Sequence, residues 1–363
     1  VATGGPGAIF WMWLMALIGA ASAFIESTLA QIYKIRGKEG EFRGGPAYYI
    51  QQGLGKRWLG IIFAWALILC FAFGFNGLQA FNMTSALEYY IPDYATNGTA
   101  VGVGIVLIVF TAFVIFGGAK RISIITSIIV PIMAIAYILI ALWTTITNIG
   151  ELPAVFATIF QSAFNFQSIA GGFAGSVVML GIKRGLFSNE AGSGSAPCAA
   201  AAAECDDPVK MGFVQALGVL IDTVVICSCT AFLMLLVPQE ITEGLAGMDL
   251  LQTALQYHLG GFGVVFIAAT LALFSFSTFL GVLYYARGNV AYLCGDNWWS
   301  QTVYKLIALA MLVIGGMQAY TVVWDLGDVG IGLMTIFNMI ALVPMAKEAL
   351  AALNDYEKRK KLQ

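Results

Sequence analysis

The stretch "GGPGAIFWMWLMALIG", from Gly4 to Gly19, indicates the architecture of this chain. A turn of glycine and proline leads directly into an apolar run, in which Glu26 is the only charged residue before Lys34. An apolar run of about 20 residues is long enough to cross a bilayer as a helix. The stretch therefore predicts a membrane-spanning helix that enters the membrane immediately after a tight turn.

The rest of the chain has the same apolar character. Of its 363 residues, 60% are hydrophobic and only 10% are charged. A soluble domain has about 25% charged residues, so the composition predicts an all-α integral membrane protein in a lipid bilayer. Nothing in it indicates a nucleic-acid partner. The six cysteines form no Cys-x-x-Cys pair, and the single histidine, His258, cannot form a metal site alone.

Nine apolar stretches predict membrane-spanning helices. They cover approximately residues 8–33, 58–90, 101–118, 122–148, 156–182, 209–237, 262–286, 303–322 and 326–346.

Lysine and arginine are confined to alternate connections between these stretches. They follow the first, third, fifth, seventh and ninth stretches, whereas the other connections contain only acidic charges. Positive charges favour the cytoplasmic side of a membrane. We therefore expect a multi-pass protein of the cell membrane, with Val1 outside and residues 347–363 forming a basic cytoplasmic tail.

The orientation of the spans suggests an internal repeat. Many secondary transporters contain two inverted repeats, and a five-helix unit would place the second repeat at residues 150–346. That repeat enters the membrane from outside, so the first, at residues 1–149, should enter from inside. The span at 8–33 also starts outside, which implies one further helix before Val1. The alternative is a nine-helix protein with an exported N-terminus.

The fifth stretch contains "FQSAFNFQSIAGGFAGSVVM", residues 160–179, where several amides and hydroxyls precede paired glycines. Unwound backbone inside a membrane is tolerated where it lines a protein-enclosed or wet cavity. We therefore expect a broken helix that contacts a substrate. Close packing of small residues through Gly171-x-x-x-Gly175 is the alternative. The substrate-binding candidates in this stretch are Ser168, Gly171, Gly172 and Phe173.

Polar residues in the second stretch follow helical spacing. Asn76, Gln79 and Asn82 are three residues apart and should share one helix face. Intramembrane amides either join helices or contact a substrate. Gln79, at the centre, is the substrate-binding candidate, together with Phe75.

Two further positions suggest ion chemistry. In "FSFSTFLG", the hydroxyls of Ser277 and Thr278 and the carbonyl of Phe274 can bind a hard cation through oxygen. Alternatively, each hydroxyl bonds to its own preceding helical turn. Asp222 lies near the middle of the sixth stretch, where a carboxylate can be a cation ligand, a proton carrier or a structural partner for backbone donors. It is therefore a candidate ion-binding or gating residue.

Several of these segments resemble the alanine or glycine:cation symporters, the sodium:alanine symporter family. The similar motifs are "GGPGAIFWMWLMALIG", "GGPAYYIQQGLG", "RGLFSNEAGSGSAP", "LIDTVVICSCTA" and "FSFSTFLG". The resemblance implies a LeuT-like fold of inverted five-helix repeats. The stretch at 156–182 would be its sixth core helix, and its first core helix would be absent from this chain. Val282 departs from the family pattern, where tryptophan is expected.

The resemblance also implies a function. We expect secondary active transport of small neutral amino acids such as alanine and glycine, with sodium as the coupling cation and no other cofactor. The alternative is a proton-coupled transporter of another small amine-containing solute. An intramembrane enzyme is disfavoured because the chain lacks a metal cluster or a Gly-x-Ser-x-Gly motif, and a channel because it lacks a charged ring motif.

Overall fold

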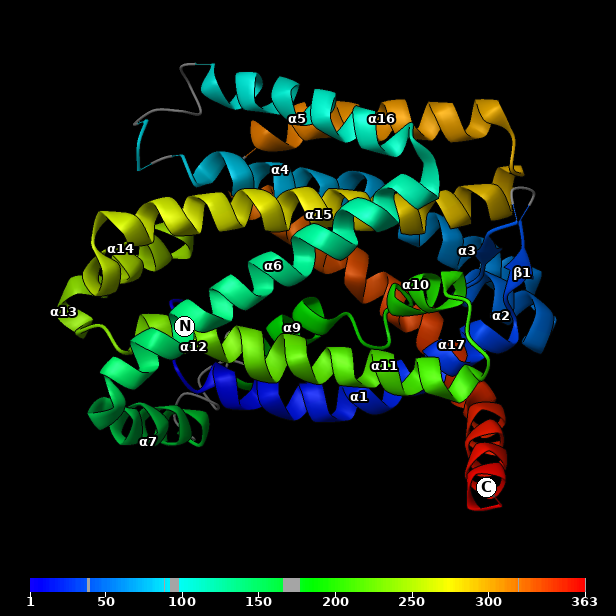
Figure 1. Cartoon of the computed structure of the whole chain (residues 1–363), viewed down its shortest axis with the longest axis horizontal. Coiled ribbons are helices and arrows are strands. Elements are labelled where there is room, and N and C mark those ends of the chain that lie inside the picture. The colour runs from blue at the N-terminus through cyan, green and yellow to red at the C-terminus, as the bar shows by residue number, and fades with distance from the viewer. Residues whose placement is uncertain (38–39, 88, 92–97, 166–176, 319, 363) are drawn as a thin grey trace.

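The computed structural model describes residues 1–37, 40–87, 89–91, 98–165, 177–318 and 320–362. These residues form a bundle of long helices with one short β-hairpin (Figure 1). The helices of the first part are α1 (Ala8–Ile32), α2 (Pro46–Leu54), α3 (Arg57–Ile68), α4 (Asn76–Ser85), α5 (Thr99–Ile115), α6 (Gly118–Thr147) and α7 (Leu152–Ala163). Those of the second part are α9 (Val177–Asn189), α10 (Ala196–Ala202), α11 (Pro208–Leu220), α12 (Cys227–Leu235), α13 (Gln239–Thr242), α14 (Gly247–Leu259), α15 (Gly261–Cys294), α16 (Trp298–Gly316) and α17 (Tyr320–Lys361).

Short elements complete the described chain. Strands β1 (Ile35–Arg36) and β2 (Phe42–Arg43) pair antiparallel, with Ile35 opposite Arg43. Two π-helical turns, η1 (Leu69–Phe75) and η4 (Ile221–Ile226), join α3 to α4 and α11 to α12 without interrupting the helical path. A single 3₁₀ turn, η2 (Ile149–Glu151), precedes α7.

The described residues contain seven helical segments long and apolar enough to cross a membrane. Their outer faces expose large apolar side chains, for example Ile132 and Trp143 of α6 at 65% and 63%. In water such a surface would favour aggregation, whereas in lipid it is the stable arrangement. The chain is therefore an all-helical integral membrane protein. The seven segments are Ala8–Ile32, Arg57–Ser85, Lys120–Thr147, Pro208–Leu235, Gly261–Cys294, Trp298–Gly316 and Thr321–Lys361.

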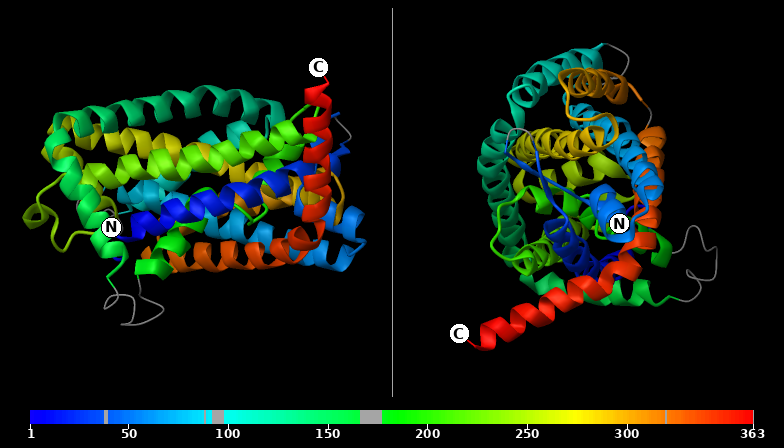
Figure 2. Two further views of the ribbon diagram at one scale, coloured as in Figure 1. Left: turned by 90° about the horizontal axis from the view of Figure 1, so that it is seen from below. Right: turned by 90° about the vertical axis from the view of Figure 1, so that its right-hand side faces the viewer.

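Most predicted spans coincide with helices, and the shorter helix α5 covers the third. The fifth span does not form one continuous helix among the described residues, because α7 ends at Ala163. Lys183 and Arg184, which directly follow the predicted fifth span, lie within α9. Helix α17 continues through the residues of the predicted basic tail to Lys361, and its last turns project from the bundle (Figure 2).

Helix α15 runs through the middle of the bundle and packs against α3, α4, α6, α14 and α16. Helix α1 packs against α9, α10 and α11, and α16 packs between α4 and α5. Close approach of α4 and α16 depends on small residues, since a Cβ on Gly315 would lie 2.1 Å from the Cα of Gly77. Glycine contacts of this kind allow membrane helices to gain packing energy that lipid alone does not supply.

Candidate substrate and cation site

A cavity of about 730 Å³ lies between α6, α10 and α15. Its polar lining comes from four regions of the chain that are distant in sequence. The side chains with polar groups that line it are Glu41, Lys120, Ser123, Thr126, Glu190, Ser277, Thr278, Tyr284 and Tyr285. Because hydroxyl and carboxyl groups from distant parts of the chain converge on it, this cavity is the main candidate site.

The two hydroxyls predicted to bind a cation line this cavity. Ser277 Oγ and Thr278 Oγ1 each donate a hydrogen bond of 2.9 Å to the carbonyl oxygen of Phe274. These bonds to the preceding helical turn are the alternative to cation binding that the sequence also allowed. Each hydroxyl oxygen still has lone pairs after donating its proton, and these are suitable ligands for a hard cation.

Glu190 also lines the cavity, and it was not among the predicted site residues. It follows directly after α9, and its main-chain carbonyl accepts a hydrogen bond of 2.6 Å from the hydroxyl of Ser193. In the sequence, Glu190 belongs to "SNEAGSGS", a glycine- and serine-rich connection beside an apolar span. The presence of a carboxylate in such a connection is the sequence feature from which Glu190 could have been predicted as a site residue.

The other acidic residue of the lining, Glu41, is neutralised by basic neighbours. Arg43 forms an ion pair with it, and the guanidinium of Arg287 lies 3.5 Å from its carboxylate. Although burial works to raise the pKa of Glu41, hydrogen bonds from its own backbone and from Arg43 hold it below the ordinary value. Arg43 also pairs with Asp296 at 2.8 Å. These contacts tie the β-hairpin to the end of α15.

Gln79 lies on α4, half-buried, and accepts a hydrogen bond of 3.3 Å from Ser275 of α15. Asn76, one turn earlier, donates to the carbonyl of Ala308 in α16 at 2.9 Å and is fully buried. The two amides therefore contact different helices. The residues recorded along the cavity do not include Gln79.

Phe75 is buried in an aromatic cluster outside the cavity lining. Its ring stacks on Phe187 of α9, with centroids 5.0 Å apart and planes at 16°. Arg184 lies 5.1 Å from the Phe187 ring and 4.9 Å from the Trp324 ring. Aromatic faces attract a guanidinium in this geometry.

An ion pair fixes the same guanidinium. Both carboxylate oxygens of Asp328, on α17, accept hydrogen bonds from Arg184, at 2.7 and 2.5 Å. Lys183 lies 2.6 Å from the same carboxylate. Together with the aromatic contacts, these interactions clamp α9 to α17.

Asp222 lies on the π-helical turn η4 and is surrounded by hydroxyls. Its carboxylate accepts a hydrogen bond of 2.5 Å from Ser188 and one of 3.4 Å from Thr223. Asn189 donates to the Thr223 hydroxyl at 3.1 Å. Among the described residues, no lysine or arginine forms an ion pair with Asp222, so its immediate partners are neutral.

The structure thus brings Ser277 and Thr278 together in the cavity, with Phe274 directly behind them. It places Gln79, Phe75 and Asp222 in separate hydrogen-bonded or aromatic clusters. The remaining predicted substrate contacts, Ser168, Gly171, Gly172 and Phe173, lie outside the described residues.

Comparison with known proteins identifies the chain's relatives. Residues 1–363 match the family described as the sodium:alanine symporter family. The chain is 46% identical over 361 residues to the amino-acid carrier protein AlsT of Bacillus subtilis, covering 99% of this chain and 76% of AlsT. It is 45% identical to the probable sodium/glutamine symporter GlnT of the same organism, covering 99% and 74%. It is 37% identical to the sodium/proton-dependent alanine carrier protein of Bacillus sp. PS3, covering 99% and 83%. The chain therefore belongs to the sodium:alanine symporter family, whose members are transporters rather than enzymes.

Proposed function

We propose that this protein couples the uptake of a small neutral amino acid, such as alanine or glycine, to the entry of sodium across the cell membrane. The observation that supports this most directly is the cavity that exposes the hydroxyls of Ser277 and Thr278 within a bundle of membrane helices. Membership of the family supports the same chemistry. Two relatives are described as alanine or glutamine carriers that depend on sodium or on sodium and protons.

In this proposal the sodium ion binds to oxygen ligands on α15. The hydroxyl oxygens of Ser277 and Thr278 form one wall of its site, and the Phe274 carbonyl orients both hydroxyls or joins them as a ligand. Asp222 is a second position where a cation or a proton can be held, because its carboxylate is bonded to neutral groups. Sodium would then serve as the coupling ion without a further cofactor.

The amino acid would bind beside Gln79 and Phe75, against the segment that contains Ser168, Gly171, Gly172 and Phe173. Unwound peptide groups there would meet the carboxylate and ammonium of the substrate. Residues 1–149 and 150–346 would act as inverted repeats of a LeuT-like fold. Their relative movement would expose the site alternately to each side, because sodium and the amino acid both favour one arrangement.

Transport into proteoliposomes tests the proposal. We expect the purified carrier to accumulate labelled alanine only when an inward sodium gradient is imposed, with saturation at high alanine. Glycine should compete, whereas glutamine competition would indicate a larger pocket. Accumulation driven by a proton gradient without sodium would support the alternative, a proton-coupled transporter. Equilibration that requires no gradient and does not saturate would contradict symport.

A further inference from the structure

Glu190 differs from the other carboxylate of the cavity in its electrostatic surroundings. Glu41 is paired with arginines, as described above. In the part of the chain that the structure describes, no lysine or arginine forms an ion pair with Glu190. The Glu190 carboxylate therefore lines the cavity without the arginine partners that neutralise Glu41.

The backbone holds Glu190 in an unfavourable conformation. Its φ angle is 50°, and among the described residues no other non-glycine residue has a positive φ. Its N–H donates to the Leu186 carbonyl at 3.0 Å at the end of α9, a position where glycine is common. A left-handed conformation is unfavourable for a residue with a side chain. Strain of this kind is retained where neighbouring structure enforces it, often at functional sites.

The neighbouring structure is a buried polar network that fixes the loop after Glu190. The N–H of Gly192 donates to Glu26 of α1 at 3.1 Å. Asn338 of α17 donates to the Gly192 carbonyl at 2.9 Å and to Glu26 at 2.8 Å. Glu26 and Asn338 are completely buried. Two membrane helices therefore hold the loop, and with it the position of Glu190.

Hydroxyl groups of the fixed loop lie next to Glu190. The hydroxyl of Ser193 donates to the main-chain carbonyl of Glu190 at 2.6 Å, and the hydroxyls of Ser193 and Ser195 lie 3.1 Å apart. Ser277 and Thr278 face the same cavity from α15. A carboxylate with hydroxyl neighbours in a cavity of low dielectric constant attracts cations strongly, and hard monovalent cations prefer oxygen ligands.

We propose that Glu190 forms a second sodium site in the cavity, which holds the ion after it leaves Ser277 and Thr278 and before it reaches the side of Lys120. This inference rests on the proposed sodium symport and adds a residue to its exit path. In this proposal sodium enters or leaves the Glu190 site through the cavity. The site can therefore exchange sodium only while the cavity is open to the side of Lys120. It should therefore affect sodium affinity on one side of the membrane only.

The test compares sodium affinity on the two sides in right-side-out and inside-out vesicles containing the carrier. Glu190→Gln should raise the sodium concentration for half-maximal alanine transport on the side of Lys120 by about tenfold, as expected from losing one charge interaction across a partly hydrated cavity. The sodium requirement on the opposite side should stay unchanged. Equal shifts on both sides, or no shift, would overturn the proposal.

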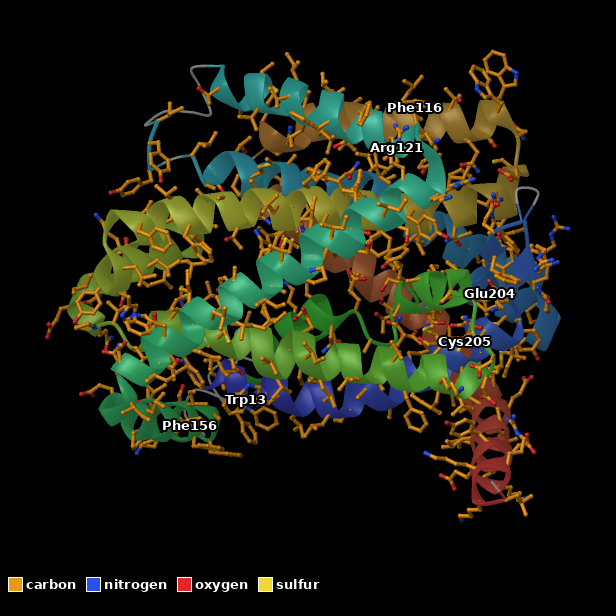
Figure 3. The ribbon with its side chains drawn as sticks, viewed as in Figure 1. Trp13, Phe116, Arg121, Phe156, Glu204 and Cys205 are labelled. Carbon is orange, nitrogen blue, oxygen red and sulfur yellow. The ribbon has the colours of Figure 1, made fainter. Side chains whose placement is uncertain are left out.

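Three further variants make the test specific. Glu204, in the α10–α11 connection (Figure 3), has an exposed carboxylate outside the cavity lining. Glu204→Gln should therefore leave the sodium requirement unchanged on both sides of the membrane. Thr278→Val should raise the sodium requirement on both sides. Glu190→Gly suits the left-handed backbone, so it should fold and reproduce the one-sided shift even if the glutamine variant is unstable.

The result also separates this proposal from the proposed function. Absence of sodium-driven alanine uptake by the wild-type carrier would refute the symport itself. A wild-type carrier that is active, with a Glu190→Gln variant indistinguishable from it on both sides, would refute only the second sodium site.

Discussion

Gln79 and Asn76 show how two similar side chains on one helix acquire different roles. Asn76 is fully buried and bonded to a backbone carbonyl of α16, whereas Gln79 is only half-buried and meets a serine hydroxyl of α15. An amide that donates to a main-chain carbonyl inside a membrane joins helices. Gln79 keeps the donor end of its amide for another partner, which is consistent with a substrate contact.

Replacing Gln79 by alanine should weaken alanine binding while the protein stays folded. A buried polar group that loses its partner costs about 1–3 kcal/mol, or roughly tenfold to a hundredfold in affinity. Binding is measured by calorimetry in saturating sodium. Asn76→Ala is the matched control, and it should lower thermal stability without changing the affinity for alanine. If Gln79→Ala binds alanine normally and only melts earlier, Gln79 is a helix–helix contact.

At the scale of elements, π-helical turns position two of the predicted residues. Phe75 ends η1 and Asp222 lies near the start of η4. A π-turn adds a residue to the helical ladder and rotates the following face, so the periodicity of an ordinary helix does not describe these positions. Asn76, Gln79 and Asn82 follow η1 and lie in the regular helix α4, where Asn76 and Gln79 are bonded to two neighbouring helices.

Packing of α4 against α16 should depend on Gly315. A Cβ there would lie 2.1 Å from Gly77 Cα and 2.6 Å from its carbonyl oxygen, so Gly315→Ala must separate the helices. Overpacking of this kind costs about 1–3 kcal/mol. We expect the Gly315→Ala variant to melt at a lower temperature than the wild type in detergent. Fluorescence-detected size-exclusion chromatography of heated samples measures the melting temperature.

Gly332→Ala in α17 provides the control, because no atom outside its own helix lies within 4 Å of the added Cβ. It should melt at or above the wild-type temperature, since alanine favours helix more than glycine does. Equal melting of the two variants would show that the α4–α16 contact contributes little to stability.

At the scale of the whole molecule, the two ends of the bundle differ in charge. One end contains β1, α2 and the C-terminus, and the other contains α7, α13 and α14 (Figure 1). The first end includes Arg36, Arg57 and Lys358, and the second includes Glu151 and Glu243. The orientation predicted from sequence would place the basic end in the cytoplasm, and it stays a prediction.

Cysteine labelling should establish that orientation. In a variant without the exposed Cys294 and half-buried Cys205, a single cysteine at Glu151 or Glu243 should react with an impermeant maleimide added to intact cells. A cysteine at Lys120 or Lys358 should react only after the cells are opened. Labelling of Lys358→Cys in intact cells would reverse the proposed topology.

Much of the architecture is predictable from the order of residues alone. The apolar stretches predict the position of every span except the fifth as one continuous helical segment. The alternating charges predict an orientation. The motifs around Gly4 and Arg184 are sufficient to recognise the family. These properties are local, because transfer of a helix into lipid depends on its own side chains. The LeuT-like repeats and an unwound segment at Gly171 and Gly172 stay predictions.

The tertiary structure decided which side chains meet. Ser275 reaches Gln79 across 196 positions of sequence, and Arg184 pairs with Asp328 across 144. Glu190 reaches the cavity of Ser277 and Thr278 because Glu26 and Asn338, from two other helices, fix its loop. Hydropathy does not determine these pairings, because lipid solvates every apolar helix face almost equally. The rotation and neighbours of each helix are instead set by small-residue contacts and a few buried hydrogen bonds between distant segments.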